Sequence, residues 1–181
     1  MRASPTDDRR ERLEALWRAH ADAVLGYALR RADGDAARDV VAETFAVAWR
    51  RLDDVPGDPL PWLLGVARKA LANRRRGDRR RGALTARLAA LPPEHGADPA
   101  ERAGEAQAVR AALGRLPSAD REALILVAWD GLTPAQAAAV AGCSPRAFSK
   151  RLSRARARLA AALVDVGAAA PHSSEAWEEP A

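Results

Sequence analysis

Apolar residues recur every three or four positions along most of the chain, which is the spacing of a buried helix face. Residues 13–28 carry one such face, residues 41–52 carry a second and residues 62–71 carry a third. A sheet would show strict alternation instead. The first part of the chain is therefore predicted to form three helices.

Turn-forming residues separate these three stretches. Gly34 follows the first as a stop signal, and Asp35 is predicted to cap the second helix. Residues 53–61 are rich in proline and turn formers, so they predict a loop that leads into the third helix near Pro61.

The periodic pattern is interrupted once. Residues 91–104 combine proline, glycine and charge without an apolar period, which indicates a flexible linker. We therefore predict an all-α protein of two small helical domains, residues 1–90 and 105–165, joined by this linker. Residues 166–181 lack a packing pattern and are predicted to be a disordered tail.

The second domain carries the start and stop signals of a helix-turn-helix. Thr133 and Gln136 form a capping box, and the short helix that follows stops at Gly142. Ser144 then opens a longer helix with Pro145 at its first position. Two capped helices joined by a glycine turn are typical of the DNA-binding motif.

Composition agrees with small helical cores. Of 181 residues, 48% are hydrophobic, but 45 residues are alanine and Ile125 is the single isoleucine, which argues against a broad sheet. Of the 29 basic residues, 27 are arginine, whose planar fork of donors suits phosphate and guanine. The isoelectric point of about 10.5 therefore indicates a polyanionic partner.

Charge is unevenly distributed. Residues 55–81 hold eight basic residues and two acidic ones, a net charge of +6, and residues 144–160 hold six basic residues and no acidic one. Residues 33–54 have a net charge of −3. This pattern predicts two nucleic-acid surfaces and an acidic face for a basic protein. An arginine run that is merely solvated or disordered is the alternative for residues 74–81.

Side chains of the second domain are placed for reading DNA. The first turns of its last helix carry Arg146, Ser149 and Lys150, which can reach base edges. Arg151, Arg154 and Arg158 follow at helical spacing and can track a phosphate backbone. The alternative is a short helical bundle with a solvated arginine face.

Several classes of protein are excluded. Cys143 is the only cysteine, so no internal disulfide or cysteine-rich zinc site can form. No apolar run approaches the ~18 residues of a membrane span, and the polar start lacks a signal peptide. No paired acid and base, metal cluster or phosphate loop is apparent. We therefore expect a cytoplasmic protein that is not an enzyme and needs no cofactor or metal.

Tryptophan placement favours packing over base stacking. Trp17, Trp49, Trp62 and Trp129 all fall on apolar faces, so they are predicted to pack in the cores. Trp62 is the strongest candidate for base stacking because it adjoins the loop.

At this point the motifs resemble a known family. DVVAETF at residues 39–45 with Ala48-Trp49, PWLLGVAR at residues 61–68, and nearly all of residues 116–159 are similar to regions 2 and 4 of the bacterial sigma-70 family, in its extracytoplasmic-function (ECF) group. The resemblance covers about residues 10–163 and implies a dissociable initiation subunit of RNA polymerase without catalysis of its own.

The resemblance implies roles for particular residues. Asp39 and Glu43 match positions that dock on the polymerase clamp helices, although ordinary helix solubility also explains the pair. The minus-10 element and opened strand would be held by Trp62, Arg68, Arg74 and Arg75, and the minus-35 element by Arg146, Ser149, Lys150, Arg151 and Arg154. Promoter DNA, polymerase core through its clamp helices and flap, and an anti-sigma protein are the partners implied.

The chain departs from the family pattern at three places. Ala42 replaces a glutamine, Lys69 replaces an asparagine, and the loop at residues 53–61 is about two residues short. Minus-10 preference is therefore not transferred. The alternative function is a helix-turn-helix transcription regulator that does not dock on polymerase core.

Overall fold

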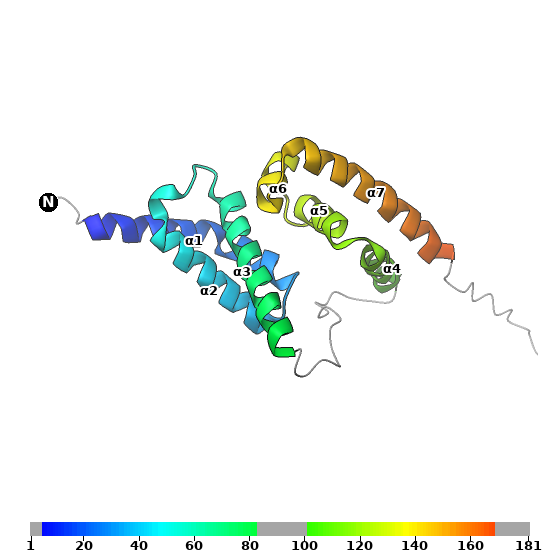
Figure 1. Ribbon diagram of the computed structural model, residues 1–181, viewed down its shortest axis with the longest axis horizontal. Coiled ribbons are helices and arrows are strands. Elements are labelled where there is room, and N and C mark those ends of the chain that lie inside the picture. Colours follow the sequence, from blue (N-terminus) through cyan, green and yellow to red (C-terminus); the bar gives the residue numbers. More distant parts are fainter. Residues whose placement is uncertain (1–4, 83–100, 169–181) are drawn as a thin grey trace, which may run out of the picture.

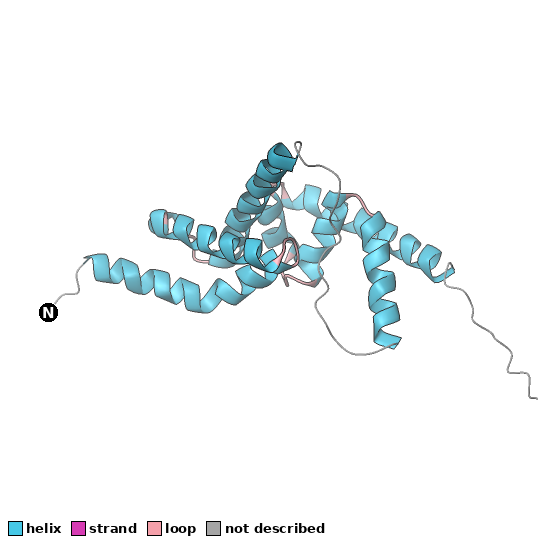
Figure 2. Ribbon diagram, turned by 90° about the horizontal axis from the view of Figure 1, so that it is seen from below, coloured by secondary structure: helices cyan, strands magenta, loops and turns pink. Residues whose placement is uncertain are grey.

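Seven α-helices and no strand make up the part of the chain that the structure describes, residues 5–82 and 101–168 of a computed structural model (Figures 1 and 2). The helices are α1 (Pro5–Leu29), α2 (Gly34–Arg50), α3 (Pro59–Gly82), α4 (Glu101–Arg115), α5 (Ser118–Ala128), α6 (Pro134–Ala141) and α7 (Pro145–Ala168), with a short 3₁₀ turn, η1 (Leu52–Asp54), after α2. The predicted all-α class is confirmed.

Helices α1, α2 and α3 pack around one apolar core. Val24 and Tyr27 of α1, Phe45 of α2 and Leu63 of α3 are all buried in it. These residues belong to the three periodic faces of the sequence, so burial of apolar area at helical spacing accounts for this half of the fold.

The start of α2 differs from the prediction. Asp33, not Asp35, is the N-cap: its backbone is extended, and its carboxylate accepts a 2.8 Å hydrogen bond from the backbone N–H of Ala36. Gly34 begins the helix instead of ending the previous one, so Asp35 lies inside the first turn. The loop before α3 is also shorter than predicted, because that helix begins at Pro59.

Helix α7 organises the second half, where it packs against α4, α5 and α6. Phe148, Leu152 and Ala155 are buried on one side of α7, as their spacing predicts. Phe148, in the first turn of α7, is completely buried, and this end of α7 packs against α6.

The two halves are packed against each other. Helix α6 lies along α3, and the buried apolar residues of both halves belong to one continuous cluster (Figure 1). The sequence gives no sign of this contact, because it predicts two domains that are joined only by a linker.

The predicted boundaries fall partly outside the described residues. Of the predicted linker, residues 91–100 lie outside, whereas Glu101 already begins α4. Of the predicted tail, α7 includes the residues up to Ala168, and the rest lies outside.

The prediction that tryptophans pack in the cores is wrong for three of the four. The side chains of Trp17, Trp49 and Trp129 remain exposed, although the Trp17 ring contacts that of Phe45 at a tilt of 56°, with ring centroids 4.6 Å apart. Trp62 is partly buried against the cluster. Helical spacing locates a face, but it does not show how far the neighbouring helices cover that face.

Candidate nucleic-acid interface

Local hydrogen bonds define the start of α6 and the turn that joins it to α7. The Thr133 N–H donates to the side-chain oxygen of Gln136 at 2.9 Å, and the Gln136 N–H donates back to the Thr133 hydroxyl at 3.3 Å. Gly142 ends α6 with φ of 69°, a left-handed conformation that glycine adopts without strain. The N–H of Ala147 then donates to the Ser144 hydroxyl at 3.3 Å. The predicted helix-turn-helix is confirmed.

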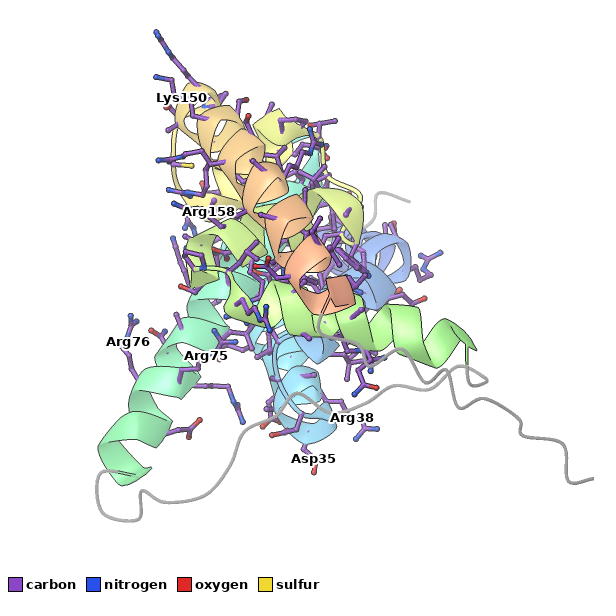
Figure 3. The ribbon with its side chains drawn as sticks, turned by 90° about the vertical axis from the view of Figure 1, so that its right-hand side faces the viewer. Asp35, Arg38, Arg75, Arg76, Lys150 and Arg158 are labelled. Atoms are coloured by element: carbon purple, nitrogen blue, oxygen red, sulfur yellow. The ribbon has the colours of Figure 1, made fainter. Side chains whose placement is uncertain are left out.

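The amino end of α7 presents an exposed polar surface. Arg146, Ser149, Lys150 and Arg154 are exposed, and Figure 3 shows Lys150 extending away from the protein. Arg151 is partly buried, and its guanidinium lies 3.9 Å from the Cys143 sulfur. Four of the five predicted minus-35 residues are thus exposed.

Arg158, a predicted phosphate contact, has an ion-pair partner within the protein. Its guanidinium donates to the carboxylate of Asp120, whose side chain is only 8% exposed and which lies in the first turn of α5. Arg158 therefore links α7 to α5, although half of its side chain still faces solvent (Figure 3).

The three arginines of α3 that are predicted to hold the minus-10 strand have partners within the protein. Arg68 donates to both carboxylate oxygens of Glu122 in α5, at 2.7 and 3.0 Å. This hydrogen bond raises the pKa of Arg68, with burial acting in the opposite direction. Arg74 donates to Asp39 at 2.9 Å, and Arg75 donates to the backbone carbonyl of Arg31 at 2.9 Å.

Trp62 lies at the start of this basic helix. Its ring is partly buried, and the Arg51 guanidinium lies 5.9 Å from the ring centroid. An aromatic face beside a cation is suited to a stacked base and its phosphate.

Fewer carboxylates are available to a basic partner in residues 33–54 than the net charge of this segment predicts. In the acidic segment, residues 33–54, Asp35 of α2 is paired with Arg38, while Asp53 and Asp54 of η1 are paired with Arg9 and Arg12 and with Arg51, respectively. Hydrogen bonding from Arg9 holds the pKa of Asp53 below its usual value. Glu43 is exposed and has no ion-pair partner in residues 5–82 or 101–168. Asp39 forms an ion pair with Arg74, but its side chain is still 63% exposed.

Sequence reasoning missed a second group of charged residues. Asp130, just after α5, accepts hydrogen bonds from Arg30 and Arg31 in the turn after α1, the latter at 2.8 Å. These partners are about 100 residues apart in the chain, so no local pattern joins them.

Other site chemistry is not found in the described residues. In those ranges no group of three histidine, cysteine or carboxylate side chains could hold a metal ion. None of the described helices combines the length and apolar character that a membrane crossing requires.

Comparison with known proteins agrees with this arrangement. Residues 16–81 match the family model described as Sigma-70 region 2, and residues 106–159 match Sigma-70, region 4. The chain is 35% identical to the ECF RNA polymerase sigma factor EcfG of Rhodopseudomonas palustris, over 75% of this chain and 76% of EcfG. It is 36% identical to the probable RNA polymerase sigma factor RfaY of Xanthomonas campestris over 69% of this chain, but it spans only 33% of the length of RfaY.

A solved structure is also similar. The sigma factor RpoE, in its complex with the anti-sigma factor NepR from Bartonella quintana, matches with a TM-score of 0.63 and 26% identity, over 83% of this chain and 96% of RpoE.

Proposed function

Because the chain belongs to the sigma-70 family, in its ECF group, we propose that it brings RNA polymerase core to promoters, reads their minus-35 and minus-10 elements and promotes opening of the DNA. As a sigma factor it is an initiation subunit of transcription, and we infer that it acts in the cytoplasm, where polymerase and chromosome meet. The observation that carries the promoter-reading proposal is the exposed Arg146–Lys150 turn on a rigid helix-turn-helix.

The second half is proposed to read the minus-35 element. The left-handed conformation of Gly142 sets the turn into α7, and the buried Phe148 holds the start of α7 against the second half. The backbone of this turn is therefore already ordered before DNA binds. Only the side chains of Arg146 and Lys150 would lose conformational freedom on entering the major groove. Arginine and lysine recognise guanine O6 and N7 there, and Arg154 would contact phosphate.

The first half is proposed to hold the opened minus-10 strand. Trp62 supplies a stacking face, and Arg68, Arg74 and Arg75 supply cations along one helix. All three arginines already donate to partners within the protein, so DNA would have to replace those partners.

Polymerase docking is proposed to use Asp39 and Glu43. They lie one turn apart on an exposed side of α2, with Ala42 exposed between them. A short alanine side chain there lets a basic helix approach closely but offers it no hydrogen bond. We propose the clamp helices as this partner, the flap as the partner of the second half, and an anti-sigma protein as a regulator that competes for these surfaces.

Co-purification of the full chain with polymerase core tests the docking surface. Glu43→Lys should abolish core binding because it places a cation where a basic partner docks, and it leaves the Asp39–Arg74 pair intact. Replacing Asp7 and Glu11 by lysine is the control, since both are exposed on α1.

Duplex binding by the same variants gives the second measurement. Selection from a randomised duplex pool identifies a preferred site, and Glu43→Lys should bind it as the unchanged chain does. A chain that binds its duplex tightly but never binds core would instead be a helix-turn-helix regulator, and the sigma mechanism would be refuted.

A further inference from the structure

Charge is segregated where the two halves meet. In the described ion pairs across this contact, the basic partners belong to the first half: Arg30 and Arg31, just after α1, and Arg68 of α3. The acidic partners in these ion pairs belong to the second half: Glu122 and Asp130. We call the three arginines the α1–α3 arginine surface and the two acids the carboxylate pair.

The carboxylate pair is held as phosphates would be held. Arg68 binds Glu122 through two parallel N–H donors, the fork geometry that arginine also uses for phosphate. Asp130 lies between the guanidinium groups of Arg30 and Arg31, and its side chain is only 1% exposed.

The arginine surface continues into the residues proposed to hold the opened strand. Arg68 belongs to both groups, and Arg75 donates to the backbone carbonyl of Arg31, so the end of α1 lies against the arginines of α3. Figure 3 shows Arg75 and Arg76 on the exposed part of this helix, beyond the region that the second half covers. One basic track therefore runs from the covered surface to the exposed end of α3.

The contact also covers the beginning of α3. Helix α6 packs along α3, and Gln136 donates a 2.8 Å hydrogen bond to the carboxylate of Asp58, just before that helix. Tyr27 lies under the Arg31 guanidinium, with 3.6 Å between that group and the ring centroid, and its hydroxyl is buried without a hydrogen-bond partner in the described residues.

We propose that Arg30 and Arg31 extend the strand-binding track of Arg68, and that the carboxylate pair masks this surface in the free chain. The ligand is the phosphate backbone of single-stranded DNA, which this proposal takes from the proposed function. Separation of the two halves, as when each docks at its own site on polymerase, exposes the surface to the strand.

The test measures binding of the full chain to a fluorescent single-stranded oligonucleotide of mixed sequence, without polymerase. Replacing Glu122 by Gln and Asp130 by Asn keeps their shape but removes both charges from the mask. We expect about tenfold tighter binding, and a salt dependence that steepens as more phosphates are neutralised.

Two further variants separate unmasking from a general change in charge. Replacing Glu11 by Gln and Asp165 by Asn removes the same charge from exposed positions and should change affinity less than about twofold. Replacing Arg30 and Arg31 by alanine within the unmasked variant should abolish the gain. Equal gains in the unmasked variant and this charge control would overturn the proposal.

If affinity for the oligonucleotide does not rise, measuring the distance between the two halves shows whether they have separated. Spin labels on cysteines placed at Arg38 and Lys150, with Cys143 replaced by serine, report the separation of the halves. A wider distance distribution in the unmasked variant without tighter binding would overturn the proposal. Neither readout needs polymerase, so a chain that fails to bind core can still show unmasking, and one that binds core can still fail to show it.

Discussion

Replacing Arg158 by alanine is expected to destabilise the second half, although the sequence pattern places this residue on a phosphate-binding face. The guanidinium pairs with Asp120, whose carboxylate is 8% exposed, whereas the Arg158 side chain is 53% exposed. Removing the arginine leaves a nearly buried carboxylate without its cation, and the cost is set mainly by that orphaned charge.

The size of the effect lies between two limits. Breaking a fully buried pair costs about 3–5 kcal/mol, and an exposed pair contributes about 1 kcal/mol or less. Since only one of these partners is buried, and since the first turn of α5 favours a carboxylate, we expect a loss of about 2 kcal/mol.

Urea denaturation followed by circular dichroism measures this loss. With a slope of about 2 kcal/mol per molar, the midpoint should fall by about 1 M. Adding Asp120→Ala to Arg158→Ala should recover part of the loss, because it removes the orphaned carboxylate. Arg154→Ala is the matched control: its side chain is exposed, so stability should change by about 0.5 kcal/mol or less.

Duplex binding separates the two arginines further. Arg154→Ala should weaken binding evenly across sequences and reduce the salt slope by about one. If Arg158→Ala left the urea midpoint unchanged and reduced the salt slope in the same way, Arg158 would be a phosphate contact and the structural reasoning would be refuted.

Three further outcomes are expected. Burial raises the pKa of Tyr27, the only tyrosine, to about 12, so its absorbance should titrate near pH 12. Because the folded chain keeps this proton to higher pH than the unfolded chain does, the free energy of unfolding should fall as pH rises from 10 towards 12. A titration midpoint near pH 10 would show that the hydroxyl reaches water. Gly142→Ala should lower the free energy of unfolding by about 1–2 kcal/mol, because the φ of 69° is strained for alanine. Gly114→Ala, in α4 with nothing near the new Cβ, should raise the free energy of unfolding by up to about 1 kcal/mol. Similar effects of the two substitutions would contradict the left-handed turn. Lys150→Ala should change base preference in a duplex selection, and an unchanged preference with uniformly weaker binding would place Lys150 on phosphate instead.

Local features were predictable because their physical causes are local. The helix-turn-helix follows from the capping box at Thr133 and the glycine at 142, and the exposed Arg146–Lys150 turn follows from helical spacing. Where the local rule fails, the difference is small: Asp33 rather than Asp35 caps α2, because the residue with the extended backbone becomes the cap. Exposure of Trp17 was not predictable, since it depends on how much of the face other helices cover.

The sequence by itself determined the helices, the family and the candidate residues for reading DNA. Only the tertiary structure decided which of those residues are already bound by carboxylates of the protein itself. Arg68 meets Glu122 across 54 positions, and Arg31 meets Asp130 across 99. Such pairs form because packing of α3 against α6 brings the helices together, and a charge carries no local signal of its partner. The arginines that the sequence predicts as free contacts for DNA are therefore, in the folded chain, partly bound by the protein's own carboxylates.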